Sequence, residues 1–147
     1  MAPRSGAHTA YDIRYHFVWI PKYRKRLLTP VRQAYLTYLL KRVAAEWDLA
    51  ILEMEIMEDH VHWFVEAPPR LSPGRIMNVV KSVTAREMFH KFPELRRVYW
   101  GGHFWADGYY VATVGDKVTA AAVRRYIRGQ RHHNPTLQDG PAPDAPD

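Results

Sequence analysis

The 147-residue sequence contains no cysteine, so it forms no disulfide and offers no thiolate ligand or thiol nucleophile. A bound metal would therefore need imidazole, carboxylate, amide or water ligands. No apolar run approaches the ~18 residues that cross a bilayer, and the opening residues MAPRSG lack the apolar stretch of a secretory signal. These absences predict a cytoplasmic protein with no membrane partner.

Acidic residues are fewer than basic ones, at 15 against 21, which gives a formal net charge of +6. Three of the acidic residues, Asp139, Asp144 and Asp147, follow the last basic residue, Arg131. The body of the chain is therefore more basic than the total suggests. This excess favours a polyanionic partner such as nucleic acid, although a basic balance that only aids solubility stays open as an alternative.

The length and the 47% hydrophobic content fit one globular domain. Residues 1–10 are expected to form a flexible N-terminus, and residues 11–133 the folded domain. From 134 to 147 the sequence is rich in Pro, Ala and Asp without periodicity. Such a composition predicts a disordered tail.

The first half of the chain shows strand, helix and hairpin signals. Aromatic and β-branched residues over 11–20 predict a strand that ends before Pro21. Thr29-Pro30 is typical of a helix start, and residues 50–67 alternate as in a hairpin, with Glu58-Asp59 at its turn. The helix is expected to bury apolar residues spaced four apart, namely Val31, Tyr35, Leu39, Val43 and Trp47.

The second half repeats the pattern. Ser72-Pro73 predicts another helix start and Phe92-Pro93 its end. A strand is expected over 104–114, and a last helix over about 119–131. The order βαββαβα predicts an α+β, ferredoxin-like sandwich with a four-stranded antiparallel sheet and a C-terminal helix. The expected apolar face of the second helix consists of Ile76, Val79, Val80, Val83 and Met88.

The segment His60-Val61-His62 stands at the start of an expected strand. Since residues i and i+2 of a strand point to one side, both imidazoles can bind the same metal ion while Val61 enters the core. Two ordinary strand histidines remain the alternative.

The last expected helix places Tyr126 and Gln130 on one face, next to arginines that include Arg125. A tyrosine beside guanidinium groups can attack a phosphodiester, provided that cations or a metal favour its phenolate, because the unperturbed phenol pKa is about 10. A half-buried helix tyrosine is the alternative. Basic and aromatic residues also alternate over 22–26, 96–100 and 103–105. This combination is typical of proteins that bind single-stranded nucleic acid, in which cations neutralise the backbone and aromatic rings stack on the bases.

Four segments together resemble the TnpA-like single-strand DNA transposases, HUH-superfamily enzymes with one catalytic tyrosine that are encoded by insertion sequences. The segments occur in the family's order and spacing, and the resemblance extends from Tyr11 to about His132. One departure is Glu58, where many relatives have proline. The matching segments are VWIPKYR (18–24), MEDHVH (57–62), GYYVATVG (108–115) and YIRGQ (126–130).

The resemblance implies that His60, His62 and Gln130 hold a divalent ion, Mg²⁺ or Mn²⁺. It implies that Tyr126 attacks a phosphodiester in single-stranded DNA, leaving a 5′-phosphotyrosine and a free 3′-hydroxyl. A 3′-hydroxyl can then attack that linkage and rejoin strands, so the enzyme would excise and insert its element.

The resemblance also implies a homodimer whose tyrosine helix can complete the partner's site, and DNA with subterminal hairpins as the substrate. Such an enzyme associates with the nucleoid when it is bound to DNA. The side chains expected to contact DNA are Lys22, Arg24, Lys25, Arg26 and Arg125.

Two alternatives stay open. The first is a non-catalytic domain that binds single-stranded DNA or RNA on the same scaffold, which leaves the set of His60, His62, Tyr126 and Gln130 unexplained. The second is a domesticated relative that uses the same residues to cut repetitive palindromes.

Overall fold

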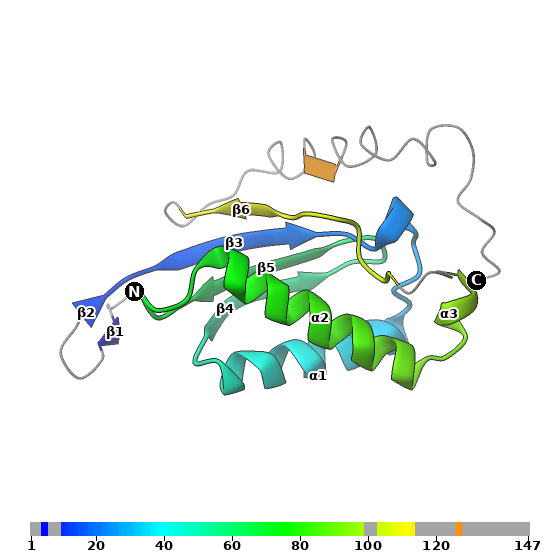
Figure 1. Cartoon of the computed structure of the whole chain (residues 1–147), viewed down its shortest axis with the longest axis horizontal. Coiled ribbons are helices and arrows are strands. Elements are labelled where there is room, and N and C mark those ends of the chain that lie inside the picture. The colour runs from blue at the N-terminus through cyan, green and yellow to red at the C-terminus, as the bar shows by residue number, and fades with distance from the viewer. Residues whose placement is uncertain (1–3, 6–9, 99–102, 114–125, 128–147) are drawn as a thin grey trace.

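The computed structural model describes residues 4–5, 10–98, 103–113 and 126–127. A four-stranded sheet carries two long helices on one of its faces (Figure 1). Residues 126–127 are helical and lie on the other side of the sheet. Within the described ranges, no helix combines the length and apolar character that a membrane span requires.

The sheet contains β3 (Arg14–Trp19), β4 (Ala50–Ile56), β5 (Val61–Glu66) and β6 (Tyr110–Ala112) in the spatial order β4-β5-β3-β6, and every neighbouring pair is antiparallel. The predicted ferredoxin-like sandwich is therefore confirmed. The predicted hairpin is present as well, because the Met57 amide donates to the His60 carbonyl at 2.8 Å across the Glu58-Asp59 turn.

The strand predicted over 11–20 is divided in two. Its first residue belongs to β2 (Ala10–Tyr11), which pairs with β1 (Arg4–Ser5), and β3 begins only at Arg14. The two pieces have different strand partners, which a continuous β-prone run cannot reveal. The flexibility expected for residues 1–10 stays a prediction.

The strand predicted over 104–114 is mostly wrong, because among its described residues, 104–113, only Tyr110–Ala112 pair with β3. Phe104 and Trp105 fill the core from a loop instead, with side chains at most 5% exposed. The Trp105 indole donates to Thr84 Oγ1 at 2.9 Å, and the Trp105 backbone forms an isolated antiparallel β-bridge with Pro21. Aromatic residues are enriched in strands, so the sequence does not distinguish a buried loop tryptophan from a strand residue, which explains the error.

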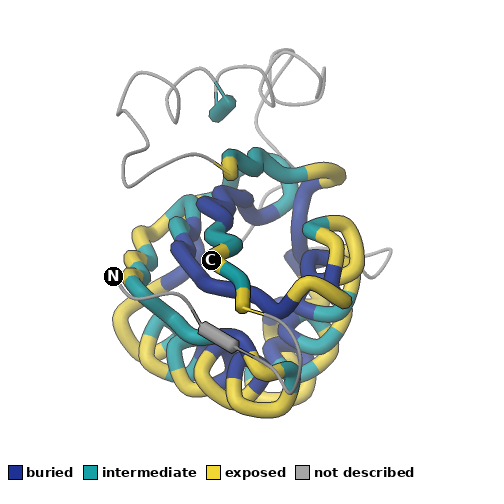
Figure 2. Tube along the Cα trace, turned by 90° about the vertical axis from the view of Figure 1, so that its left-hand side faces the viewer, coloured by how far each residue is buried: buried dark blue, intermediate teal, exposed yellow. Residues whose placement is uncertain are grey.

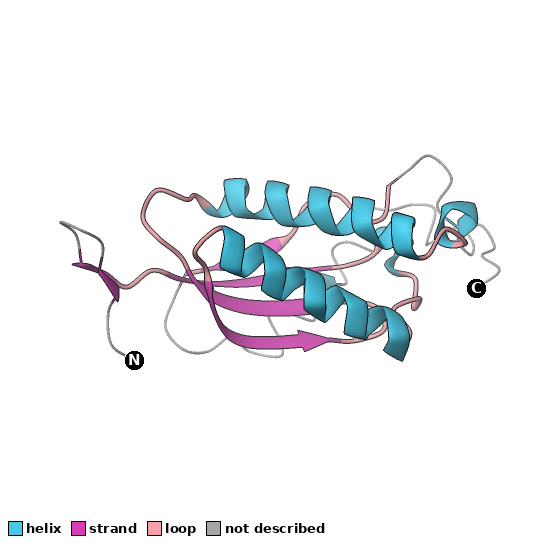
Figure 3. Ribbon diagram, turned by 90° about the horizontal axis from the view of Figure 1, so that it is seen from below, coloured by secondary structure: helices cyan, strands magenta, loops and turns pink. Residues whose placement is uncertain are grey.

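The helices are α1 (Pro30–Glu46), α2 (Pro73–Lys91) and a short α3 (Leu95–Val98) that was not predicted. Figure 3 shows α1 and α2 side by side across the sheet. The apolar face expected for α1 is partly wrong, because Val31 is 69% exposed. The residues that α1 buries are Leu36, Leu39, Leu40, Val43 and Ala44.

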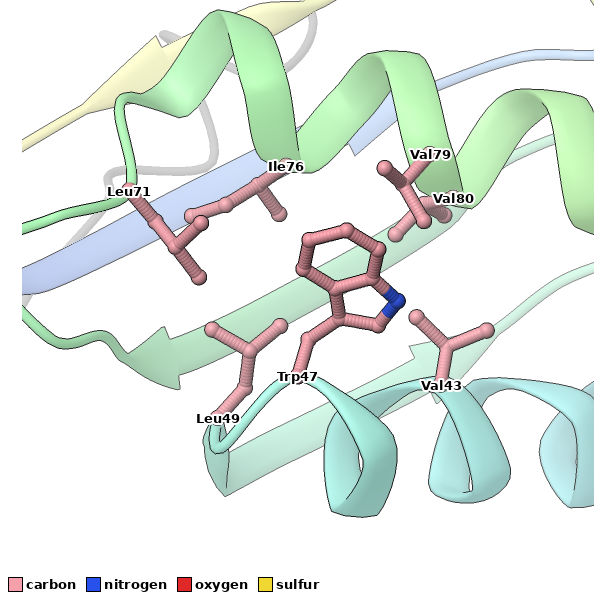
Figure 4. Close-up of a pocket in the computed structure, with 7 residues that line it drawn as sticks. All are labelled: Val43, Trp47, Leu49, Leu71, Ile76, Val79 and Val80. Atoms are coloured by element: carbon pink, nitrogen blue, oxygen red, sulfur yellow. The ribbon is translucent and has the colours of Figure 1, made fainter.

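The core lies between the sheet and the helices, and the exposed positions follow the outer sides of the helices (Figure 2). Phe17 and Trp19 of β3 and Trp63 of β5 are fully buried there. At one end of the helix pair, the half-buried Trp47 packs among apolar side chains from both helices (Figure 4). Its indole also lies 5.5 Å from the guanidinium of Arg75.

The expected last helix falls almost entirely outside the described residues. Only Tyr126 and Ile127 are described, and both are helical. The expected tail over 134–147 lies outside the described residues as well.

Candidate active site

The face of the sheet that points away from α1 and α2 is called here the open face because neither of these helices covers it, although His16, Val18 and Phe64 on it are buried. Paired residues on neighbouring strands point to the same face, so the strand register arranges the side chains there in rows. One row runs across the sheet as Tyr110, Val18, His62 and Glu55. The next row runs as Ala112, His16, Phe64 and Glu53.

The two motif histidines belong to this face. His62 is in β5, and His60 stands two residues before it, at the point where the hairpin turn enters the strand. Val61 between them is fully buried in the core, as the sequence predicted. The alternation of the strand therefore turns both imidazoles away from the helices.

His60 is oriented by its neighbour in the turn. Its Nδ1 lies 3.0 Å from Oδ1 of Asp59, and Nε of Arg24 lies 3.3 Å from Oδ2 of the same carboxylate. The hydrogen bond with His60 holds the pKa of Asp59 below its ordinary value, and the charges of His60, Arg24 and Arg26 act in the same direction. An ionised Asp59 thus accepts the Nδ1 proton of His60 and directs Nε2 outward.

The backbone that carries Arg24 is unusual. Tyr23 and Arg24, in the short helix η1 (Lys22–Arg24), have φ angles of 63° and 50°. Non-glycine residues rarely adopt this left-handed conformation, and two in succession are costly unless surrounding contacts hold them. Here the turn brings the guanidinium of Arg24 to Asp59. The conformation therefore supports the orientation of His60.

His62 has a partner that the sequence reading missed. Its Nε2 lies 3.4 Å from Nδ1 of His16, which is in β3 and only 2% exposed. Burial lowers the pKa of His62, although the negative charges of Glu53 and Glu55 act to raise it, so the neutral imidazole is favoured. The neutral form is the one that binds metals.

Tyr126 lies over the open face. Its ring centroid is 6.2 Å from that of Tyr110, with 54° between the two planes. Tyr110 is in the same row as His62, two strands away, or about 10 Å at the usual strand spacing. The structure therefore places the predicted nucleophile and the two motif histidines on the same face.

The predicted DNA-contacting residues of the basic segment are described, and several already have partners. Lys22 Nζ lies 5.3 Å from the ring centroid of Tyr23, and Arg26 forms an exposed ion pair with Glu58 at 3.0 Å. Lys25 is half-buried. The remaining predicted site residues, Gln130 and Arg125, lie outside the described residues.

A shallow groove of about 430 Å³ borders this site. It lies beside the hairpin turn, and Gln33 of α1 also lines it. The residues lining the groove are Arg26, Gln33, Ile56, Met57, Glu58, Asp59 and His60.

The described ranges contain no group of three His, Cys, Asp or Glu side chains arranged to hold one metal ion. A metal at His60 and His62 would therefore need a further ligand from elsewhere, such as an amide, water or substrate oxygen. Gln130 is the residue that was predicted to supply such an amide.

The chain is similar to known transposases. The family model for IS200-like transposases matches residues 9–130. The chain is 33% identical over 127 residues to the ISDra2 transposase TnpA of Deinococcus radiodurans, covering 86% of this chain and 90% of that protein. It is 32% identical over 127 residues to the transposase for insertion sequence element IS200 of Salmonella typhimurium, covering 86% and 82%.

Solved structures show the same likeness. A Deinococcus radiodurans R1 protein assigned as a transposase superposes with a TM-score of 0.79 at 32% identity, covering 86% of this chain and 97% of that one. A REP-associated tyrosine transposase bound to a REP hairpin gives a TM-score of 0.52 at 15% identity, covering 94% and 81%. The second likeness is one of fold alone.

Proposed function

The chain belongs to the family of IS200-like transposases, and from that premise we propose that it cleaves and rejoins single-stranded DNA at insertion-sequence ends through a 5′-phosphotyrosine. The observation that carries the proposal is the placement of Tyr126 over the sheet face that bears His60 and His62. A domain that only bound nucleic acid would have no need for this placement.

The proposed cleavage is a transesterification. The Tyr126 oxygen attacks the scissile phosphorus and forms a P–O bond, while the bond to the 3′-oxygen breaks and that oxygen leaves as a 3′-hydroxyl with the phenol proton. The number of phosphodiester bonds is unchanged. A second 3′-hydroxyl can therefore attack the phosphotyrosine, which rejoins DNA and restores the free tyrosine.

The residues present fit a divalent ion at His60 and His62. Among the described residues, the hydrogen bonds of these imidazoles use Nδ1 of His60 and Nε2 of His62, so the other nitrogen of each ring remains for a ligand. Gln130 is proposed to add an amide oxygen. When bound, Mg²⁺ or Mn²⁺ would act as a Lewis acid on the phosphate oxygens, and the imidazole ligands favour Mn²⁺ of the two.

The proposed DNA partner is a single strand that folds into subterminal hairpins. The REP-associated tyrosine transposase is bound to a REP hairpin in its solved structure, and the basic charge of this chain suits such a ligand. The proposal includes DNA contacts from the basic residues named above, action at the nucleoid, and a homodimer in which a partner's tyrosine helix can complete each site.

The test uses 3′-labelled single-stranded DNA copied from both flanks of the gene. The full-length protein is mixed with this DNA and Mg²⁺ or Mn²⁺, and the products are separated on a denaturing gel. The label lies on the side of the break that Tyr126 retains. We expect a labelled band at protein mass that disappears with chelator and with Tyr126→Phe.

Tyr110→Phe is the matched control, because it removes a hydroxyl from the neighbouring ring without touching the proposed nucleophile. It should retain the adduct. Binding of flank DNA without any adduct or cleavage would instead establish the non-catalytic alternative.

A further inference from the structure

We propose that His16 is a positioning residue for the metal site, and that it fixes the tautomer and ring orientation of His62 through an imidazole–imidazole hydrogen bond. The inference rests on the proposed function, in which His62 binds the divalent ion. His16 is not in the HUH motif, and it comes from a different strand, β3.

Three observations locate His16. The strand register sets it opposite Phe64, diagonal to His62 on the same open face. Its imidazole stacks on the Phe64 ring at 3.8 Å between centroids with 4° between the planes. Its Nδ1 then points to Nε2 of His62 at 3.4 Å. The stacking fixes the plane of His16, so that the His16 nitrogen meets His62 from one direction.

The direction of this hydrogen bond decides whether His62 can bind a metal. A neutral imidazole has one protonated nitrogen, which donates, and one with a lone pair, which accepts. If His16 accepts at Nδ1, then His62 carries its proton on Nε2 and offers the Nδ1 lone pair to an ion. If His16 donates instead, the neutral His62 carries its proton on Nδ1 and has no lone pair left for a metal. The proposed site therefore requires His16 to act as the acceptor.

His16 would thus do for His62 what Asp59 does for His60. Metal-binding histidines generally donate their second N–H to a carboxylate, carbonyl or water, and loss of that acceptor typically costs 10–100-fold in metal affinity. Here one motif histidine uses a carboxylate from its own turn, and the other uses an imidazole from the adjacent strand.

The test compares His16→Phe with His16→Asn. Phenylalanine retains a ring that can stack on Phe64 but removes the acceptor nitrogen, Nδ1 of His16. Asparagine restores an acceptor, because its side-chain oxygen can take the hydrogen bond from Nε2 of His62. His90→Phe, on the exposed side of α2, is the matched control. Thermal unfolding of each variant checks that the fold is retained.

The first readout is the ring NMR spectrum of His62 in the metal-free protein. We expect a single tautomer with a slowly exchanging Nε2–H, which becomes fast-exchanging in His16→Phe and slow again in His16→Asn. A His62 protonated on Nδ1 in the unsubstituted protein would overturn the proposal.

The second readout is Mn²⁺ affinity, measured by calorimetry without DNA. His16→Phe should weaken Mn²⁺ binding about 10–100-fold, and His16→Asn should recover most of it. If the unsubstituted protein binds Mn²⁺ and His16→Phe binds it equally well, His16 has no positioning role. If the unsubstituted protein binds no Mn²⁺, the metal part of the proposed function fails instead, so the two failures are distinguishable.

Discussion

The two faces of β5 differ in how they hold their side chains. Val61, Trp63 and Val65 point to the helices and are fully buried in apolar contacts. His62 and the adjacent His60 point the other way, and each is held by a directed hydrogen bond, one from β3 and one from the turn. Apolar burial is non-directional and stabilises the fold, whereas a metal ligand needs a defined orientation. One strand thus supplies apolar burial on the helix side, and on the other side it combines a buried Phe64 with oriented imidazoles.

Among the substitutions that separate the two faces of β5, Trp63→Ala is expected to have the largest effect, a loss of unfolding free energy. Trp63 packs edge-on against Trp19 at 6.1 Å, and truncation of such a residue leaves a cavity that costs about 3–5 kcal/mol of unfolding free energy. Urea denaturation measures this loss. The half-buried Trp47 is the matched control, and Trp47→Ala should cost clearly less. Equal losses would mean that the core is not concentrated against β5.

The next largest effect is expected on Mn²⁺ affinity, from Asp59→Ala on the other side of β5. Loss of the acceptor for His60 Nδ1 should weaken Mn²⁺ binding about 10–100-fold, as measured by calorimetry. Glu58→Ala is the control, because Glu58 is the adjacent turn residue and its side chain pairs with Arg26 across an exposed contact worth at most about 1 kcal/mol. The two faces would not be separable in this way if Glu58→Ala weakened Mn²⁺ binding as strongly as Asp59→Ala.

Most of the helix-covered face could be predicted from the sequence. Alternation over β4 and β5 and the proline at each helix start reflect local rules, and they led to the correct fold. The errors arose where tertiary packing overrides local pattern. The pattern around Trp105 predicts a strand, but Trp105 fills the core from a loop. Val31 fits the helical repeat of apolar residues, but it faces solvent.

The open face could be predicted only in part. The i, i+2 spacing revealed His60 and His62, because both belong to one strand. Their partners could not be found in this way. His16 meets His62 only through the register between β3 and β5, and Arg24 reaches Asp59 only through a left-handed turn. Asp59 itself reads as an ordinary turn residue. A histidine at a matching position of a neighbouring strand is the one signal that could have been used.

The smallest effect concerns the two helix starts, which have the same sequence signal but different contacts. Ser72 Oγ accepts a hydrogen bond from the Arg75 amide at 3.1 Å, whereas Thr29 accepts no such cap bond within the described residues. Ser72→Ala should therefore lower the unfolding free energy by about 1 kcal/mol, and Thr29→Ala by a smaller amount, as measured by urea denaturation. Neither variant should change Mn²⁺ affinity, since both caps belong to the helices on the covered face. A change in Mn²⁺ affinity from Ser72→Ala would show that helix stability and site geometry are coupled through the sheet.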